Sequence, residues 1–97
     1  MFDVRLTRGF VDDLRLIPKT DQVAALDAIE QHLVHEPDRE TRNRKRLRPN
    51  RLAEWELRVG TFRVFYDVDT ADRIVKVVTL GRKEGNRLFV RGRVFEL

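Results

Sequence analysis

Arg58 and Arg63 are the two residues whose type and spacing suggest chemistry most directly. Residues 55–59 and 62–66 each alternate apolar and polar, and Gly60-Thr61 between them is a typical type II′ turn pair. A hairpin around this turn pairs residue 59 with 62, and therefore Arg58 with Arg63 on its polar face. Because like charges placed opposite each other are destabilising, the pattern predicts a surface that binds an anion.

The same alternation divides this hairpin and the following strand between two faces. We expect residues 69–72 to close a second hairpin that leads into an apolar strand at residues 74–80. The buried face should then carry Trp55, Leu57, Val64, Tyr66, Val75 and Val77. The open face should carry Glu56, Arg58, Arg63, Phe65 and Lys76. An exposed aromatic beside arginines can stack on a nucleobase, so Phe65 and Lys76 are predicted to contact nucleic acid. The alternative for Phe65 is packing beneath the C-terminal tail or a partner.

A basic segment precedes the hairpin. Seven of the thirteen residues from 39 to 51 are arginine or lysine. Such a cluster gains phosphate affinity by releasing counterions, which favours a nucleic-acid or ribosome-docking surface over a simply solvated loop. The residues of this region that we expect to bind nucleic acid are Arg44, Lys45, Arg46, Arg48, Arg51 and Arg58.

The elements that must position these residues can be placed along the chain. Residues 2–6 alternate as a strand, Thr7 can cap a helix that ends before Pro18, and a second helix should span residues 20–35. The apolar stripe of this second helix is Val23, Leu26, Ile29 and Leu33. The order strand, two helices, three strands and a last short strand at 87–90 predicts one α+β domain over residues 1–97. In this domain, the N-terminal strand and helical hairpin pack on one face of a mainly antiparallel four- to five-stranded sheet.

Composition limits the class of partner and site. The net charge of +4 and a pI near 10.1 favour a polyanionic partner. There is no cysteine for disulfides or thiolate metal sites, and His32 and His35 alone are too few for a zinc site, so we expect no metal. The N-terminus is charged where a signal peptide is apolar, and no apolar run approaches the length of a membrane span. We therefore expect a cytoplasmic protein with no membrane association.

Four segments together resemble a known family. They are residues 46–49 (RLRP), 55–60 (WELRVG), 62–66 (FRVFY) and 77–83 (VVTLGRK). With the N-terminal strand and helical hairpin, they make the chain similar to the RelE/ParE superfamily, the toxins of bacterial type II toxin–antitoxin modules. The resemblance implies that a cognate antitoxin binds the protein and holds it inactive.

The resemblance also implies roles for particular residues. RelE-like members are ribosome-dependent endoribonucleases in which a ribose 2′-OH attacks the adjacent phosphate. Arg63 matches the phosphate-stabilising arginine of the family, and Arg82-Lys83 lies where the family has another arginine. Glu54 and Glu56 stand where the nucleases carry lysines, and Phe89 stands about where they carry a tyrosine. Glu56 is a candidate general base in this altered set.

Three functions remain open from the sequence. The preferred one is a ribosome-dependent mRNA endoribonuclease, with Arg63, Arg82, Lys83 and Glu56 as catalytic residues and with the ribosome and mRNA as partners. The second is a ParE-like, non-enzymatic inhibitor of DNA gyrase, which the missing lysines and tyrosine favour. The third is a non-toxic relic that binds an antitoxin. None of the three implies a cofactor.

Overall fold

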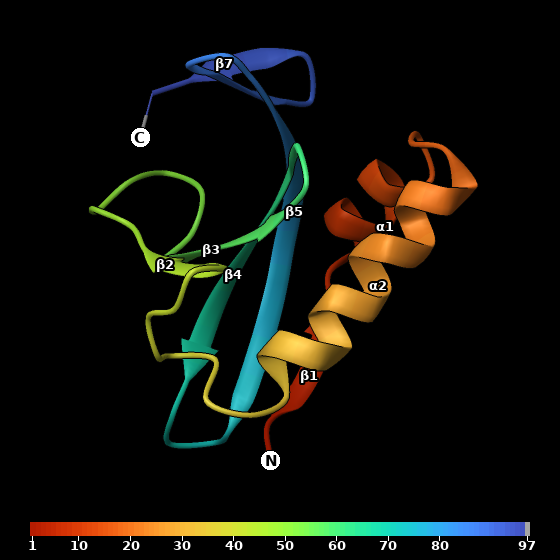
Figure 1. Cartoon of the computed structure of the whole chain (residues 1–97). Helices are drawn as coiled ribbons and strands as arrows, with labels where there is room; N and C mark the ends of the chain where they lie inside the picture. The colour runs from red at the N-terminus through yellow and green to blue at the C-terminus, as the bar shows by residue number, and fades with distance from the viewer. Residues whose placement is uncertain (97) are drawn as a thin grey trace.

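The computed structural model describes residues 1–96, which form two helices and one seven-stranded sheet (Figure 1). The elements are β1 (Asp3–Leu6), α1 (Arg8–Leu14), α2 (Lys19–Leu33), β2 (Arg44–Arg46), β3 (Trp55–Val59), β4 (Phe62–Asp69), β5 (Ile74–Glu84), β6 (Arg87–Val90) and β7 (Arg93–Phe95). The sheet order is β2-β3-β4-β5-β6-β7, antiparallel throughout, with β1 parallel to β5. The predicted α+β fold is confirmed, and the sheet is larger than expected because β2 and β7 extend it.

The β3–β4 hairpin has the register that its alternation predicts. Arg58 lies opposite Arg63, and Trp55 lies opposite Tyr66 with their ring centroids 6.1 Å apart. Gly60 has a φ of +59°, which a type II′ turn requires at its first central residue. Tyr66 is fully buried and its Oη donates a hydrogen bond to the carbonyl of Pro37 at 2.8 Å. Burial raises the pKa of Tyr66 far above its ordinary value, so its hydroxyl stays neutral and serves the core.

The β4–β5 pairing differs from the prediction. A β-bulge between Phe65 and Tyr66 shifts the register, so that Tyr66 lies opposite Val77 and Lys76 lies opposite Asp67. Asp67 is four residues from Arg63 along β4, which corresponds to about 13 Å. Lys76 therefore lines a separate hollow with Glu54 and Asp67, away from Arg63, and the expectation that it joins Arg63 and Glu56 was wrong.

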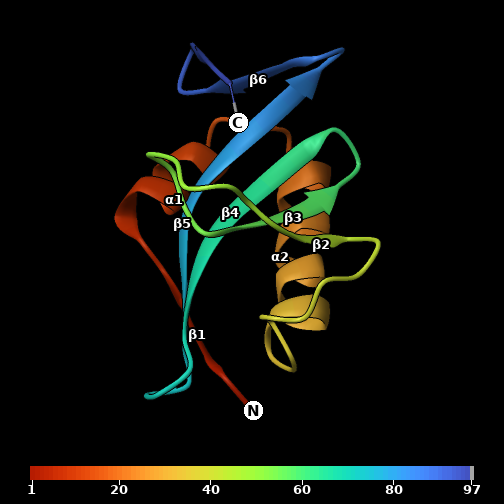
Figure 2. The ribbon, with the colours of Figure 1, turned by 90° about the vertical axis from the view of Figure 1, so that its left-hand side faces the viewer.

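Both helices cover one face of the sheet, as Figure 1 shows, and Figure 2 shows α2 behind β3 and β4. Thr7 caps α1 by accepting a hydrogen bond from the backbone of Phe10 at 3.1 Å, as predicted. The apolar stripe expected on α2 is wrong in its first half, because Val23 and Leu26 are 48% and 39% exposed. The helix buries a different stripe of i, i+4 spacing, namely Ala25, Ile29 and Leu33. Neither helix is long and apolar enough to cross a membrane within the described residues.

A second, smaller core lies on the other face of the sheet. Phe65 is fully buried there against Leu88 and Val90 of β6. Gly81 of β5 makes room for this packing, since a Cβ at that position would come within 3.1 Å of Phe65 and Leu88. The expectation that Phe65 is exposed for base stacking was therefore wrong, and packing under the C-terminal segment is what the structure shows. The partly buried residues around this cluster are Leu47, Leu52, Ala53 and Phe95.

Candidate functional site

A groove of about 630 Å³ opens on the sheet face away from the helices. One wall is β2 and the start of the loop that follows it, and the other is the end of β5 with the C-terminal β6–β7 hairpin. Basic side chains predominate around the groove: Lys45, Arg46, Arg48, Arg58, Arg63 and Lys83. The acidic lining residues are Glu56 and Glu96. The surplus of positive charge suits an anionic ligand.

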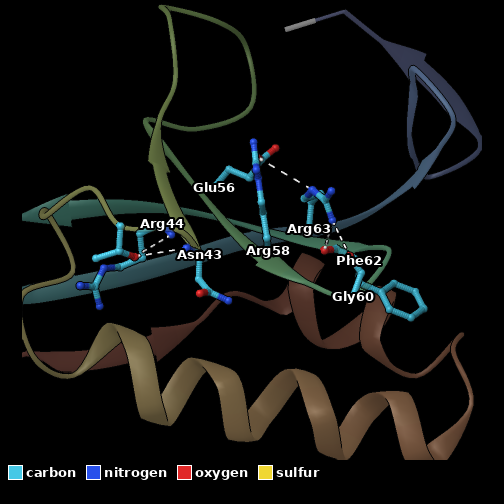
Figure 3. A network of polar contacts seen from close by, with 8 residues as sticks. Asn43, Arg44, Glu56, Arg58, Gly60, Phe62 and Arg63 are labelled. Atoms are coloured by element: carbon cyan, nitrogen blue, oxygen red, sulfur yellow. Dashed lines mark hydrogen bonds and ion pairs between the residues drawn. The ribbon is translucent and has the colours of Figure 1, made fainter.

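The floor of the groove is a small charge network around Glu56 (Figure 3). Oε2 of Glu56 lies 3.4 Å from Nε of Arg58 and 4.0 Å from Nε of Arg63. The side chains of Glu56 and Arg63 are only 10% and 14% exposed, whereas Arg58 is nearly half exposed. The carboxylate explains how two arginines can face each other across the hairpin, because it neutralises part of their repulsion.

Arg63 is held in place by the turn of its own hairpin. Its Nη1 donates to the carbonyl of Gly60 at 2.8 Å and to the carbonyl of Phe62 at 2.9 Å, as Figure 3 shows. A guanidinium fixed by two carbonyls loses little side-chain freedom when it binds an anion. Arg63 is thus both a structural residue of the turn and a cation of the groove floor.

Arg82 and Lys83 point to opposite faces of the sheet, as neighbours on a strand must. Lys83 lines the groove, and its backbone N–H donates to the carbonyl of Thr61 at 2.8 Å, which ties the end of β5 to the β3–β4 turn. Arg82 forms an ion pair with Glu84 at 2.6 Å and lines a separate hollow beside the helical hairpin. The structure therefore brings Lys83 to Arg63 and Glu56, and it does not bring Arg82 there.

Arg44 was predicted to contact nucleic acid, but the structure buries it. Its Nη1 donates to the carbonyl of His32 at 2.7 Å and its Nε donates to the carbonyl of Arg39 at 2.9 Å. These bonds satisfy a free carbonyl in the last turn of α2 and fix the segment between α2 and β2. Burial, and to a lesser degree the nearby Arg44 charge, lowers the pKa of His32. Arg44 is thus a structural residue and is not available to a ligand.

The rest of the basic segment is exposed and is carried by a rigid loop. Lys45, Arg46 and Arg48 line the groove, whereas Arg51 lies further along the loop and outside it. Asn50 holds the loop: its Oδ1 accepts from the backbone N–H of Leu52 and Ala53, and its Nδ2 donates to the carbonyls of Arg48 and Ala53. Asn50 was not among the predicted residues, although Pro-Asn between polar residues is a typical turn signal.

Within residues 1–96 no three His, Cys, Asp or Glu side chains lie close enough together to hold a metal ion. The groups that the groove does offer are the carboxylates of Glu56 and Glu96 and several cations. The cations of this set can bind a phosphodiester, and a carboxylate beside them can accept a proton from a neighbouring hydroxyl.

Comparison with known families identifies the chain. Residues 4–87 match the family described as the ParE toxin of type II toxin–antitoxin systems, parDE. The chain belongs to this family. It is therefore the toxin of a type II toxin–antitoxin system and a member of the RelE/ParE superfamily, as its sequence motifs predict. No curated protein sequence matches it.

Two solved structures resemble the toxin over most of its length. One is the toxin–antitoxin complex RelBE2 from Mycobacterium tuberculosis, with a TM-score of 0.73 and 26% identity, over 84% of this chain and 91% of that one. The other is the archaeal RelE–RelB complex from Pyrococcus horikoshii, with a TM-score of 0.68 and 26% identity, over 87% of this chain and 96% of that one. The likeness to both confirms the fold and supports an antitoxin as a partner of this toxin.

Proposed function

We propose that this toxin is an endoribonuclease that cleaves mRNA on the ribosome and thereby inhibits translation. The observation that carries the proposal is the carboxylate of Glu56 between the guanidinium groups of Arg58 and Arg63, on the floor of a basic groove that Lys83 also lines. A general base beside fixed cations is what cleavage by a ribose 2′-OH requires.

In the proposed reaction Glu56 accepts the proton of the 2′-OH while the 2′-oxygen forms a bond to phosphorus. Arg58 and Arg63 stabilise the negative charge that develops on the phosphate oxygens. The bond from phosphorus to the 5′-oxygen breaks, Lys83 donates a proton to that oxygen, and the upstream fragment keeps a 2′,3′-cyclic phosphate. Arg82 has no part in this scheme, because its side chain lies on the other face.

The exposed cations of the β2 loop would dock the toxin on RNA. Lys45, Arg46, Arg48 and Arg51 can each contact one phosphate, and each contact releases counterions. Four such contacts to single-stranded RNA imply that the affinity falls about 50-fold between 50 and 200 mM salt. Two known structures of similar toxins are complexes with antitoxins, and we propose that an antitoxin likewise binds and inactivates this toxin in the cytoplasm.

The test is primer-extension mapping of mRNA cleavage after brief induction of the toxin without antitoxin. We expect cuts within codons that require ribosomes. Lys83→Ala should abolish the cuts and Glu56→Gln should slow them at least about 100-fold. Arg82→Ala is the matched control, since it removes the neighbouring charge from the opposite face, and it should cut like the wild type. Cutting by Glu56→Gln at the wild-type rate would exclude Glu56 as the base. Arg63→Ala is a less clean variant, because Arg63 also binds two carbonyls of the turn.

A second candidate is non-enzymatic inhibition of DNA gyrase. The family description favours it, because the matched family is that of ParE toxins. The position of Glu56 on the groove floor also favours gyrase inhibition. Its carboxylate already neutralises part of the positive charge of Arg58 and Arg63 that a phosphate would meet. This function predicts growth arrest with DNA damage and no mRNA cuts. Purified toxin should then inhibit supercoiling by gyrase, and Glu56→Gln should not weaken that inhibition.

A further inference from the structure

Arg91 stands in a backbone conformation that its residue type does not favour. Arg91 and Gly92 connect β6 to β7 and have φ values of +52° and +75°. Two positive φ angles are typical of a type I′ turn, in which the first central residue is usually Asn, Asp or Gly. An arginine retained in such a conformation is compensated by contacts made elsewhere.

Those contacts are made with α1, on the helical side of the sheet. Nε of Arg91 donates to Oδ1 of Asp13 at 3.1 Å, across 78 positions of sequence. The guanidinium also lies against Gly9, where a Cβ would collide with its Nη2. Gly9 and Asp13 are four residues apart and share one face of α1. The side chain of Arg91 thus lies along this face of the helix, over a glycine that leaves room for it.

Asp13 is itself firmly held, which makes it an effective anchor. Its side chain is only 10% exposed. Oδ2 of Asp13 accepts from Oγ1 of Thr79 at 2.7 Å and from the backbone N–H of Leu80 at 3.4 Å. Asp13 therefore connects α1, β5 and the turn of the C-terminal hairpin.

Near this turn the C-terminal hairpin contacts the sheet through Val90, which packs in the small core with Phe65 and Leu88. β6 pairs with β5 only from Arg87 to Phe89, so the distal residues 90–93 have no ladder bonds to β5. A two-stranded hairpin is marginally stable by itself. The same hairpin supplies Leu88 and Phe95 to the wall of the groove. The position of this wall consequently depends on how its turn is held.

We propose that Arg91 and Asp13 are positioning residues that hold the C-terminal hairpin as a wall of the RNA-binding groove. Neither residue lines the groove, so their effect on RNA is transmitted through the hairpin. The proposal links the helical face of the toxin to its groove through one ion pair. It rests on the proposed function only in naming RNA as the ligand of the groove.

The test uses Arg91→Gln, Asp13→Asn and the double variant in the full chain. Arg93→Gln is the matched control, because it removes the same charge from the same hairpin and Arg93 forms no ion pair within residues 1–96. Amide hydrogen exchange reports on the hairpin, and the binding of a short fluorescent single-stranded RNA reports on the groove. Arg91→Lys keeps the charge and should partly restore both.

We expect amide exchange in β6 and β7 to rise about tenfold in Arg91→Gln and Asp13→Asn, with β3 and β4 unchanged. The affinity for RNA should fall about threefold to tenfold, and the double variant should be no worse than either single one. Equal amide exchange in β6 and β7 of Arg91→Gln and Arg93→Gln would show that the Arg91–Asp13 pair does not hold the hairpin. A loosened hairpin with unchanged RNA affinity, or a wild type that binds no RNA, would overturn the link to the groove. RNA binding without cleavage would instead contradict the proposed nuclease activity and leave the proposed role of Arg91 and Asp13 supported.

Discussion

The two faces of the sheet differ in how they are built. In the part of the chain that the structure describes, twelve buried residues form the core under the helices, whereas three form the cluster under the groove. The helical face is held mainly by apolar packing. The groove face carries its charge on β2 with its loop and on the central strands, and its two walls, the β2 loop and the C-terminal hairpin, pack around Phe65. The groove walls can therefore be altered at little cost to the stability of the domain, so function and stability can be tested separately.

The largest expected effect separates the two cores. Phe10→Ala removes a fully buried ring under the helices and should lower the free energy of unfolding by about 4 kcal/mol. Leu88→Ala should cost about 2 kcal/mol, because the small cluster can relax, and should mainly raise hydrogen exchange in β6 and β7. Urea unfolding and hydrogen exchange measure both effects. Equal losses of global stability would mean that the two cores unfold as one unit.

The next effect contrasts neighbouring residues of β2. Arg44→Ala removes two hydrogen bonds from a buried guanidinium to backbone carbonyls and should cost about 2 kcal/mol of stability. Lys45→Ala should change stability by less than about 0.5 kcal/mol, because Lys45 faces the groove. For RNA affinity and its salt dependence, measured by fluorescence titration, Lys45→Ala should have a larger effect than Arg44→Ala. If Arg44→Ala weakened RNA binding in a protein that is still folded, Arg44 would have to reach the ligand.

A smaller effect concerns the acidic groups of each face. Glu56→Gln removes a negative charge from the groove floor and should tighten RNA binding about fivefold, which corresponds to about 1 kcal/mol. Glu84→Gln makes the same charge change beside Arg82 and should leave binding almost unchanged. The RNA affinities of Glu56→Gln and Glu84→Gln are compared by fluorescence titration at one salt concentration. Equal effects would mean that net charge, and not the position of Glu56, controls binding.

The smallest effect is a pH dependence of the helical side. Burial lowers the pKa of His32 in the folded state, so the unfolded chain binds a proton at this residue more readily than the folded chain does. Stability should therefore fall slightly as pH drops from about 7 through 6.5, the ordinary histidine value. His32→Gln should flatten the curve in this window. If His32→Gln leaves the slope of the unfolding free energy against pH unchanged, His32 is not the source of this pH dependence.

The sequence predicted best where one local pattern controls the structure. The β3–β4 register was predictable, because the alternation and the Gly60 turn each specify the same pairing. Lys76 was misplaced because the bulge beside Phe65 depends on packing between strands, which alternation does not report. The strand β2 was missed because its three basic residues carry no strand signal, and β7 was missed because three residues are too few to show an alternating pattern.

The candidate site was predicted in part for a similar reason. Arg58, Arg63 and Glu56 meet in one groove as strand alternation predicts, and Lys83, predicted from the family resemblance, lines the same groove. Phe65 and Arg44 were misassigned because their burial is produced by segments distant in sequence, the C-terminal hairpin and the end of α2. The Arg91–Asp13 pair had no sequence signal, since its partners are 78 positions apart.

The parallel pairing of β1 with β5 has a consequence for the synthesis of this protein. Asp3 pairs with Ile74, so β1 leaves the ribosome 71 residues before the strand with which it pairs. At about 5–20 residues per second, this interval lasts roughly 4–14 seconds. Until then β1 and α1 lack β5, on which they pack, and Asp13 lacks the hydrogen bond that it accepts from Thr79. A nascent toxin therefore has no assembled groove until β5 and the C-terminal hairpin have been made.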